Sequence, residues 1–230
     1  MAGAVSKAKA EEFWEVLQAP VRQLQGGWVI PILLITAPVV AFTRRRFDNG
    51  RLEHVHDLLD QMCEKTFKTQ SFDLPQHRRV TLFKYKRFCI WRFPFFGGFL
   101  VPIERSGNDT RKTNSIFKVH DNGEKNEGIA GRVWSANASL AVFELPDIEG
   151  ECGESNLDDY AAKTFYPRKK LDRLDKRPNA RSLMGIPVQV SNKRWGVIVI
   201  DSIKPNFTDR TARDAFSAIA KSLSAQLRGL

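Results

Sequence analysis

The feature that most constrains the fold is a change in the spacing of apolar residues along the chain. Residues 52–67 and residues 208–227 carry apolar side chains at helical spacing. Between them lie three strand-like stretches, RVTLFKYK, FCIWRF and GGFLVPIE, which begin at Arg79 and are bounded by glycine, proline or charged turns. Leu183–Val190 and Trp195–Ile200 flank a short polar turn, which is typical of a hairpin. The pattern predicts an α/β (α+β) fold with an antiparallel sheet and flanking helices.

The segments between these elements give weaker signals. Ser106–Glu127 is rich in Asn, Asp, Gly and Lys, and we expect a loop there. A short helix should begin at Gly128 and reach Trp134, followed by an apolar strand over Leu140–Phe143. The acidic, glycine-containing stretch Asp147–Asp159 indicates another loop, and Tyr160–Phe165 should form one or two helical turns.

A second strong feature is the uncharged run Trp28–Phe42, WVIPILLITAPVVAF. As a helix this run would be roughly 22 Å long, while an average bilayer core is about 30 Å thick. The tryptophan at one end and the arginines at the other resemble an aromatic anchor and a positive stop. Two prolines would each remove a helical hydrogen bond, which membrane helices tolerate. Three interpretations stay open: a single span, a monotopic insertion, and a buried helix of a water-soluble core.

The predicted organisation has four parts: an amphipathic helix at residues 1–26, a membrane segment with a positive flank at 27–47, a connecting helix at 48–68, and a folded domain at 69–230. The apolar stripe of the connecting helix suits either pairing with a second copy or packing on its own domain. If the run spans the cell membrane, the arginine cluster places the C-terminal domain in the cytoplasm. The expected membrane-contacting residues are Trp28, Ile30, Leu33, Leu34, Val39, Phe42, Arg44, Arg45 and Arg46.

Composition and motif content limit which binding partners and which reactions we expect for this chain. The net charge of +10 and the pI of about 9.7 favour an anionic partner. Membrane lipid and a small anionic ligand or nucleotide are expected, and nucleic acid is not. The three cysteines are widely separated and fit neither a disulfide framework nor a metal-ligand spacing. No P-loop, His-Glu-x-x-His, nucleophile elbow or kinase motif occurs, so we predict no catalytic residue and no metal site, and the sequence names no cofactor.

Two sequence blocks resemble the GAF domain family. Residues 127–134, EGIAGRVW, with the following Ala138–Pro146, are similar to the GEGLAGRV helix and next strand of that family. Arg181–Val188, the hairpin that reaches Ser202, and Phe207-Thr208-Asp209 resemble its closing signature. The blocks occur in the family's order, and the resemblance covers roughly residue 52 to the end of the sequence. It implies about six antiparallel strands between two helical layers, with the first and last helices on one face and a ligand pocket on the other.

The resemblance also implies where a ligand would bind. In GAF-like folds the region between the short pocket helix and the closing hairpin often covers the ligand, and here it is basic. Arginines can grip phosphates with two hydrogen bonds, and aromatic rings can stack on a base. The alternatives are a solvated surface with internal ion pairs to Asp172 and Asp175, attachment to anionic headgroups, and aromatic rings that fill the core. The candidate ligand-binding residues are Arg168, Lys169, Arg173, Arg177, Arg181, Tyr160 and Phe165.

The functional prediction combines these features. A membrane-anchored GAF-type sensory or regulatory protein would bind a small, anionic or nucleotide-like ligand and signal by homo-oligomerisation or through its membrane segment. One alternative is a non-enzymatic GAF scaffold without a ligand that acts in protein-protein interaction. The other is a thiol redox enzyme similar to free methionine sulfoxide reductases, which would use Cys152 in the loop Glu149–Gly153.

Overall fold

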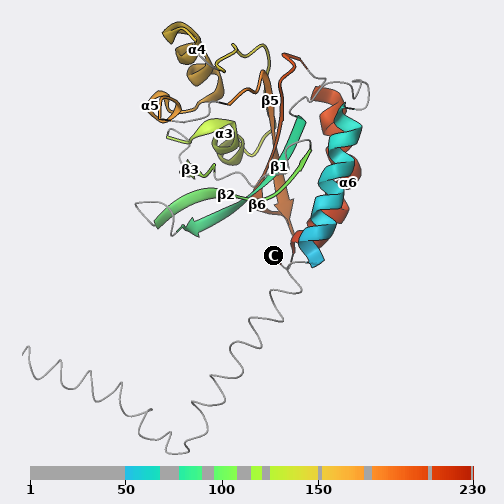
Figure 1. Cartoon of the computed structure of the whole chain (residues 1–230). Coiled ribbons are helices and arrows are strands. Elements are labelled where there is room, and N and C mark those ends of the chain that lie inside the picture. The colour runs from blue at the N-terminus through green and yellow to red at the C-terminus, as the bar shows by residue number, and fades with distance from the viewer. Residues whose placement is uncertain are drawn as a thin grey trace, which may run out of the picture. The chain divides into compact units, whose positions relative to one another are not determined.

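The computed structural model describes residues 50–67, 78–89, 96–107, 115–120, 125–149, 152–173, 178–206, 209–228 and 230 (Figure 1). All of them belong to one unit of the chain, Gly50–Leu230, and residues 1–49 form a separate unit. The predicted amphipathic helix at 1–26 and the predicted membrane segment at 27–47 therefore lie outside the described residues.

A six-stranded antiparallel sheet forms the centre of the described part, with strand order β3-β2-β1-β6-β5-β4. This confirms the predicted antiparallel sheet with helices. The two long central strands β1 and β6 pair from Arg78 with Ser202 to Lys84 with Gly196. The strands are β1 (Arg78–Phe88), β2 (Phe96–Gly107), β3 (Phe117–Val119), β4 (Leu140–Val142), β5 (Ser182–Val190) and β6 (Lys193–Ser202).

The hairpin between β5 and β6 follows directly from its turn residues. Val190 pairs with Lys193, which leaves the two residues Ser191 and Asn192 as the loop. Both have positive φ angles, 51° and 60°. A two-residue turn of this kind matches the twist of the flanking strands, and asparagine tolerates the left-handed conformation well. The predicted hairpin is thus confirmed.

Two helices cover one face of the sheet, namely the helix of residues 50–67 and α6 (Asp209–Leu227) (Figure 1). Val55, Leu59 and Met62 of the first helix are fully buried and share a core cluster with Ile219 and Leu223 of α6. Burying one such side chain contributes roughly 1.5 to 3 kcal/mol. The apolar stripe of the predicted connecting helix therefore packs on its own domain, which is one of the two alternatives for it.

The short helix α3 (Gly128–Ala136) covers the opposite face. Its Ile129 and Val133 are buried against Phe83 of β1 and Val197 of β6. Close approach of α3 to β5 requires Gly185, because a Cβ atom at this position would lie only 2.6 Å from Cγ2 of Val133. The helix predicted to begin at Gly128 is thus confirmed, and the glycine allows the helix to contact the sheet backbone.

Beside α3, the helices α4 (Glu154–Thr164) and α5 (Arg168–Leu171) cover a separate, smaller core (Figure 1). The prediction of a loop up to Asp159 was wrong, because α4 begins at Glu154. Glu154 in the first turn complements the helix dipole. Leu157 lies about one turn before Tyr160, the first residue of the predicted helical turns. The prediction of a continuous loop over Ser106–Glu127 was also wrong, because β3 pairs there with Gly98–Leu100 of β2.

Candidate ligand-binding face

The first residue of α5, Arg168, is held by two carboxylates of α4 and one from the turn after α5. Its Nε donates to Oδ1 of Asp158 at 2.8 Å, Nη2 pairs with Glu154, and Nη1 pairs with Asp172. Pro167 precedes it as the N-cap residue with an extended backbone, and its ring restricts φ to values near the observed −61°. With three carboxylates around one guanidinium, the local charge is negative. Arg168 ties α5 to α4 and offers little free positive charge to an anion.

Three further cations lie on α5 or in the turn after it, and one of them forms an ion pair with a carboxylate. Lys170 pairs with Glu127, whose other carboxylate oxygen accepts a hydrogen bond from the Lys118 backbone at 3.0 Å. This links α5 to the start of α3 and to β3. Lys169 and Arg173 are exposed, and no ion pair joins either to another residue within the described ranges. Two of the predicted ligand-binding residues are thus available to an anion.

Arg181, another predicted ligand-binding residue, holds the backbone of the fold together. Its amide donates to the carbonyl of Ser202 at 2.8 Å, and its Nε donates to the carbonyl of Leu145 at 2.6 Å. These bonds attach the residue before β5 to the end of β6 and to the segment after β4. The remaining candidate, Arg177, lies outside the described residues.

The two predicted stacking residues differ sharply in burial. Tyr160 is 3% exposed and packs in the core under α4 with Leu145 and Ile148. Burial raises the pKa of its hydroxyl, and the nearby Asp201 carboxylate adds to the rise. Phe165 is 37% exposed and ends α4 in the left-handed conformation at φ 56°. Tyr160 therefore fills the core, while the ring of Phe165 is accessible.

Sequence reasoning missed two aromatic contacts on this face. The guanidinium of Arg132 on α3 lies 4.8 Å from the centre of the Phe165 ring. Trp134, also on α3, stacks on Tyr85 at 4.4 Å with an angle of 10° between the rings, and its buried Nε1 has no hydrogen-bond partner among the described residues. The GRVW segment contains both α3 residues, but only the packing of α3 shows which rings they meet.

The model of the GAF domain family matches residues 79–227. This chain belongs to the GAF domain family. The match spans the sheet, α3, α4, α5 and α6, so the resemblance carried by the two sequence blocks is confirmed. No curated protein matches the chain.

Several solved structures are similar to this GAF chain at low sequence identity. A type II free methionine-R-sulfoxide reductase from Thermoplasma acidophilum has 14% identity and a TM-score of 0.44, with 77% of this chain and 94% of that one covered. The GAF domain of a two-component sensor histidine kinase from Bacillus halodurans has 16% identity and a TM-score of 0.42, with 74% and 91% covered. The GAF domain of an Acinetobacter phosphoenolpyruvate-protein phosphotransferase has 12% identity and a TM-score of 0.41, with 80% and 92% covered.

The predicted membrane residues of this GAF protein, from Trp28 to Arg46, all lie outside the described residues. Among the helices that the structure does describe, none combines the length and apolar character needed to cross a bilayer. The prediction of a membrane segment at 27–47 stays a prediction.

The cysteines of the GAF domain lie apart, and none forms a disulfide. Burial raises the pKa of Cys63 from 9.0 to about 11, and the Asp60 carboxylate contributes to the rise. Cys152 is half-buried at the border of the small core under α4, and Cys89 is buried. Within the described ranges, no group of three or more His, Cys, Asp or Glu residues could hold a metal ion.

Proposed function

We propose that this chain is a membrane-anchored regulatory GAF protein that binds a small anionic ligand and signals through its membrane segment or by oligomerisation. The observation that carries the proposal is the uncharged run Trp28–Phe42, followed by Arg44–Arg46 and then directly by the GAF unit at Gly50. An apolar run next to a cluster of arginines is the pattern of a membrane anchor with a cytoplasmic positive flank.

The helix of residues 50–67 supports a regulatory role because it joins the anchor to the sheet. It begins four residues after the arginine cluster and packs on the same sheet that α3 covers from the other side. A shift of α3 on ligand binding would change the packing of β1 and β6, which both helical layers share. Coupling of this kind needs a two-state element that both sites bias, and in this proposal the central strands, which pack against both helical layers, have that role.

The ligand site in this proposal lies on the surface formed by α3, α4 and α5. Arg132 and the exposed ring of Phe165 lie against each other, and Lys169 and Arg173 follow on α5 and in the turn after it. Guanidinium and ammonium groups next to an accessible aromatic ring suit a ligand that has a phosphate or carboxylate and a planar group. Tyr160 and Arg181 have no part in it, because both serve the fold.

A scaffold without a ligand is the second candidate function. It is favoured by the side chains that occupy the face under α3, where Tyr85 stacks on Trp134 and Phe117 contacts both Phe83 and Tyr166 edge to face. Aromatic rings in this arrangement stabilise a core and leave less room for a ligand. Mass spectrometry of small molecules that co-purify with the protein separates the two: a bound nucleotide or other anion supports the sensor, and its absence across ligand screens supports the scaffold.

The anchoring itself is tested by fractionation of the full-length protein. We expect it in the membrane fraction and resistant to extraction by salt, while a variant with Leu33→Arg and Leu34→Arg should appear in the soluble fraction, because charged side chains in the apolar run oppose insertion. The control is Lys65→Glu, a change of charge on the exposed side of the helix of residues 50–67, and it should stay in the membrane fraction. Leu58→Arg is unsuitable as a control, because Leu58 packs against the core. Wild-type protein that stays soluble without detergent would contradict the proposal.

A further inference from the structure

Seven cations gather at one end of the sheet, and we call this set the basic end. It comprises the last residues of β1, the first residues of β6 and one arginine each from the helix of residues 50–67 and the end of α6. β1 and β6 are antiparallel neighbours, so the end of β1 lies beside the start of β6. The set is Arg51, Lys84, Lys86, Arg87, Lys193, Arg194 and Arg228.

Contacts between elements hold their ends together at the basic end. Lys84 pairs with Gly196 in the sheet, its Nζ donates to the carbonyl of Leu230, and it lies 5.5 Å from the ring of Trp195. Leu230, which follows α6, therefore lies beside Lys84 of β1. Nη1 of Arg194 donates to the carbonyl of Trp134 at 3.0 Å, and the guanidinium lies 5.1 Å from the centre of the Trp134 ring, so this charged group packs against the end of α3.

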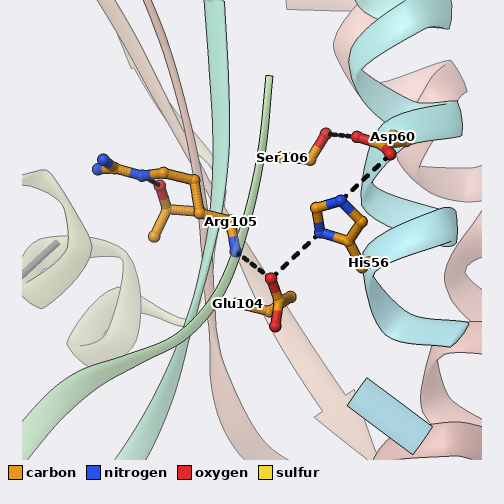
Figure 2. Close-up of polar contacts among 6 residues, drawn as sticks. His56, Asp60, Glu104, Arg105 and Ser106 are labelled. Carbon is orange, nitrogen blue, oxygen red and sulfur yellow. Dashed lines mark hydrogen bonds and ion pairs between the residues drawn. The ribbon is translucent and has the colours of Figure 1, made fainter. Parts of the chain in front are cut away.

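The helix of residues 50–67 also begins at the basic end. Figure 2 shows two contacts that set its register: His56 lies 3.1 Å from Glu104, and Ser106 donates to Asp60. His56 and Asp60 are four residues apart on the helix, a rise of about 6 Å, and Glu104 and Ser106 are two residues apart on β2, a rise of about 6.6 Å. Because the later helix residue contacts the later strand residue, the helix runs parallel to β2. Tracing back from His56 to Gly50 covers about 9 Å, or roughly three strand residues, and so reaches Val101 of β2. Val101 pairs with Lys84.

The chain that precedes residue 50 thus joins the domain level with Lys84. Its last residues before the junction include Arg44, Arg45 and Arg46. The basic end is therefore the end of the GAF domain to which the proposed membrane anchor is covalently attached.

Acidic residues are few in the segments that carry the exposed cations of the basic end. Residues 84–88, 191–195 and 221–230 contain no Asp or Glu, and Glu53 adds one negative charge on the helix. Lys86, Arg87, Lys193 and Arg228 are exposed, and in the described part of the chain no ion pair joins any of them to a carboxylate. Phe88, next to Arg87, is 48% exposed. Cations around an exposed aromatic ring fit the interfacial region of a membrane, where the ring is buried and the charges meet headgroups.

We infer that the basic end is a docking surface for anionic lipid headgroups, and that it holds the GAF domain against the membrane that the preceding segment enters. This inference rests on the proposed anchoring and extends it, because it assigns an orientation to the domain and a lipid class to the membrane. Each basic residue near an anionic surface contributes about fivefold to binding. The interaction weakens at raised salt, because the Debye length falls from about 10 Å at 0.1 M to about 3 Å at 1 M.

The test uses the full-length protein with vesicles of phosphatidylcholine alone and vesicles that also contain phosphatidylglycerol. Flotation with the first kind reports anchoring. Hydrogen exchange of residues 84–88 and 191–195 then reports docking, and we expect slower exchange only when the anionic lipid is present. The triple variant Lys86→Glu, Arg87→Glu and Lys193→Glu should lose this protection, as should wild-type protein at raised salt.

A charge-matched control places three reversals away from the basic end, at Lys65, Arg210 and Arg213, all of which are exposed and lie outside the proposed ligand site. It should keep the protection that the first variant loses. Equal loss in both variants would overturn the inference, because it would show an effect of net charge alone. Loss only in the control would assign the lipid contact to the region around Lys65 and the start of α6, and would overturn the inference as well.

The two proposals fail in different ways. If the protein floats with phosphatidylcholine vesicles but phosphatidylglycerol does not slow hydrogen exchange, the anchoring proposal stands and the inferred docking surface is wrong. Absence of flotation with phosphatidylcholine contradicts the anchor, while flotation with anionic vesicles that depends on Lys86, Arg87 and Lys193 still supports the docking surface. If these residues instead change binding to a single-stranded oligonucleotide and leave the vesicle results unchanged, the partner is a nucleic acid and the lipid inference is wrong.

Discussion

The α4–α5 region and the basic end contain the same types of cation, yet they differ in what surrounds them. Arg168 contacts three carboxylates, and Lys163 and Lys170 each contact one. At the basic end, the exposed cations Lys86 and Arg87 have no such partners among the described residues. In a dense basic stretch of sequence, some cations can therefore be neutralised in the fold, as Arg168 and Lys170 are here, while scattered cations from four elements can assemble into a positive surface. This difference predicts distinct responses of the two regions to substitution.

The largest expected difference is the loss of stability when an aromatic residue of each region is replaced by alanine. Tyr160→Ala should lower the free energy of unfolding by about 3 to 5 kcal/mol, because it removes a buried ring from the core under α4. Phe88→Ala should change it by less than about 1 kcal/mol, since half of the ring is already exposed. Urea denaturation of both variants measures this. A small effect for Tyr160→Ala together with a loss of ligand binding would restore Tyr160 to the ligand site.

The next largest effect concerns anion binding by the unpaired cations of the α5 region. Lys169→Ala and Arg173→Ala should each weaken binding of a nucleotide ligand by about 1 to 3 kcal/mol, the usual contribution of a charge-assisted hydrogen bond. Their stability without ligand should not change, because both side chains are exposed. Calorimetry against cyclic mono-, di- and trinucleotides provides the measurement. Lys86→Ala is the matched control, and an equal loss of binding there would show that the effect comes from net charge.

A smaller effect is expected where the cation is already paired. Arg168→Met keeps much of the stem but leaves Glu154, Asp158 and Asp172 without a counter-charge, so the free energy of unfolding should fall by about 1 to 2 kcal/mol at low salt. Added salt should reduce the difference, because the three carboxylates are partly or largely exposed. Arg87→Met should change stability by at most about 0.5 kcal/mol. Equal results for the two arginines would remove the distinction between the regions.

The smallest effect concerns Cys152, which packs at the border of the core under α4. If this thiol is not catalytic, Cys152→Ser should preserve ligand binding and cost less than about 1.5 kcal/mol of stability. A folded Cys152→Ser protein that loses a methionine sulfoxide reductase activity shown by the wild type would instead support the redox enzyme. Cys63→Ser is the control, because a thiol whose pKa is raised to about 11 is a weak nucleophile at neutral pH.

Most of the fold follows from spacing, while the site depends on contacts between distant residues. The helical period of residues 52–67 and the alternation in Leu183–Val190 are local, and the structure agrees with both. β3 was missed because three residues carry too little periodicity, and its strand character comes from pairing with β2. The pairing of Arg168 with Asp172 lies within one helical turn and was among the predicted alternatives. Glu154 and Asp158 reach the same guanidinium only through the packing of α4 beside α5.

The outermost strands also limit how copies of this protein can associate. β3 and β4, which border the sheet, each contain only three residues, whereas the inner strands contain 9 to 12. Long open edges allow foreign strands to add to a sheet and lead to aggregation, and very short edge strands offer few unpaired backbone groups for that purpose. We therefore expect the homo-oligomer that the signalling proposal calls for to form through helical surfaces, with the two sheets remaining separate.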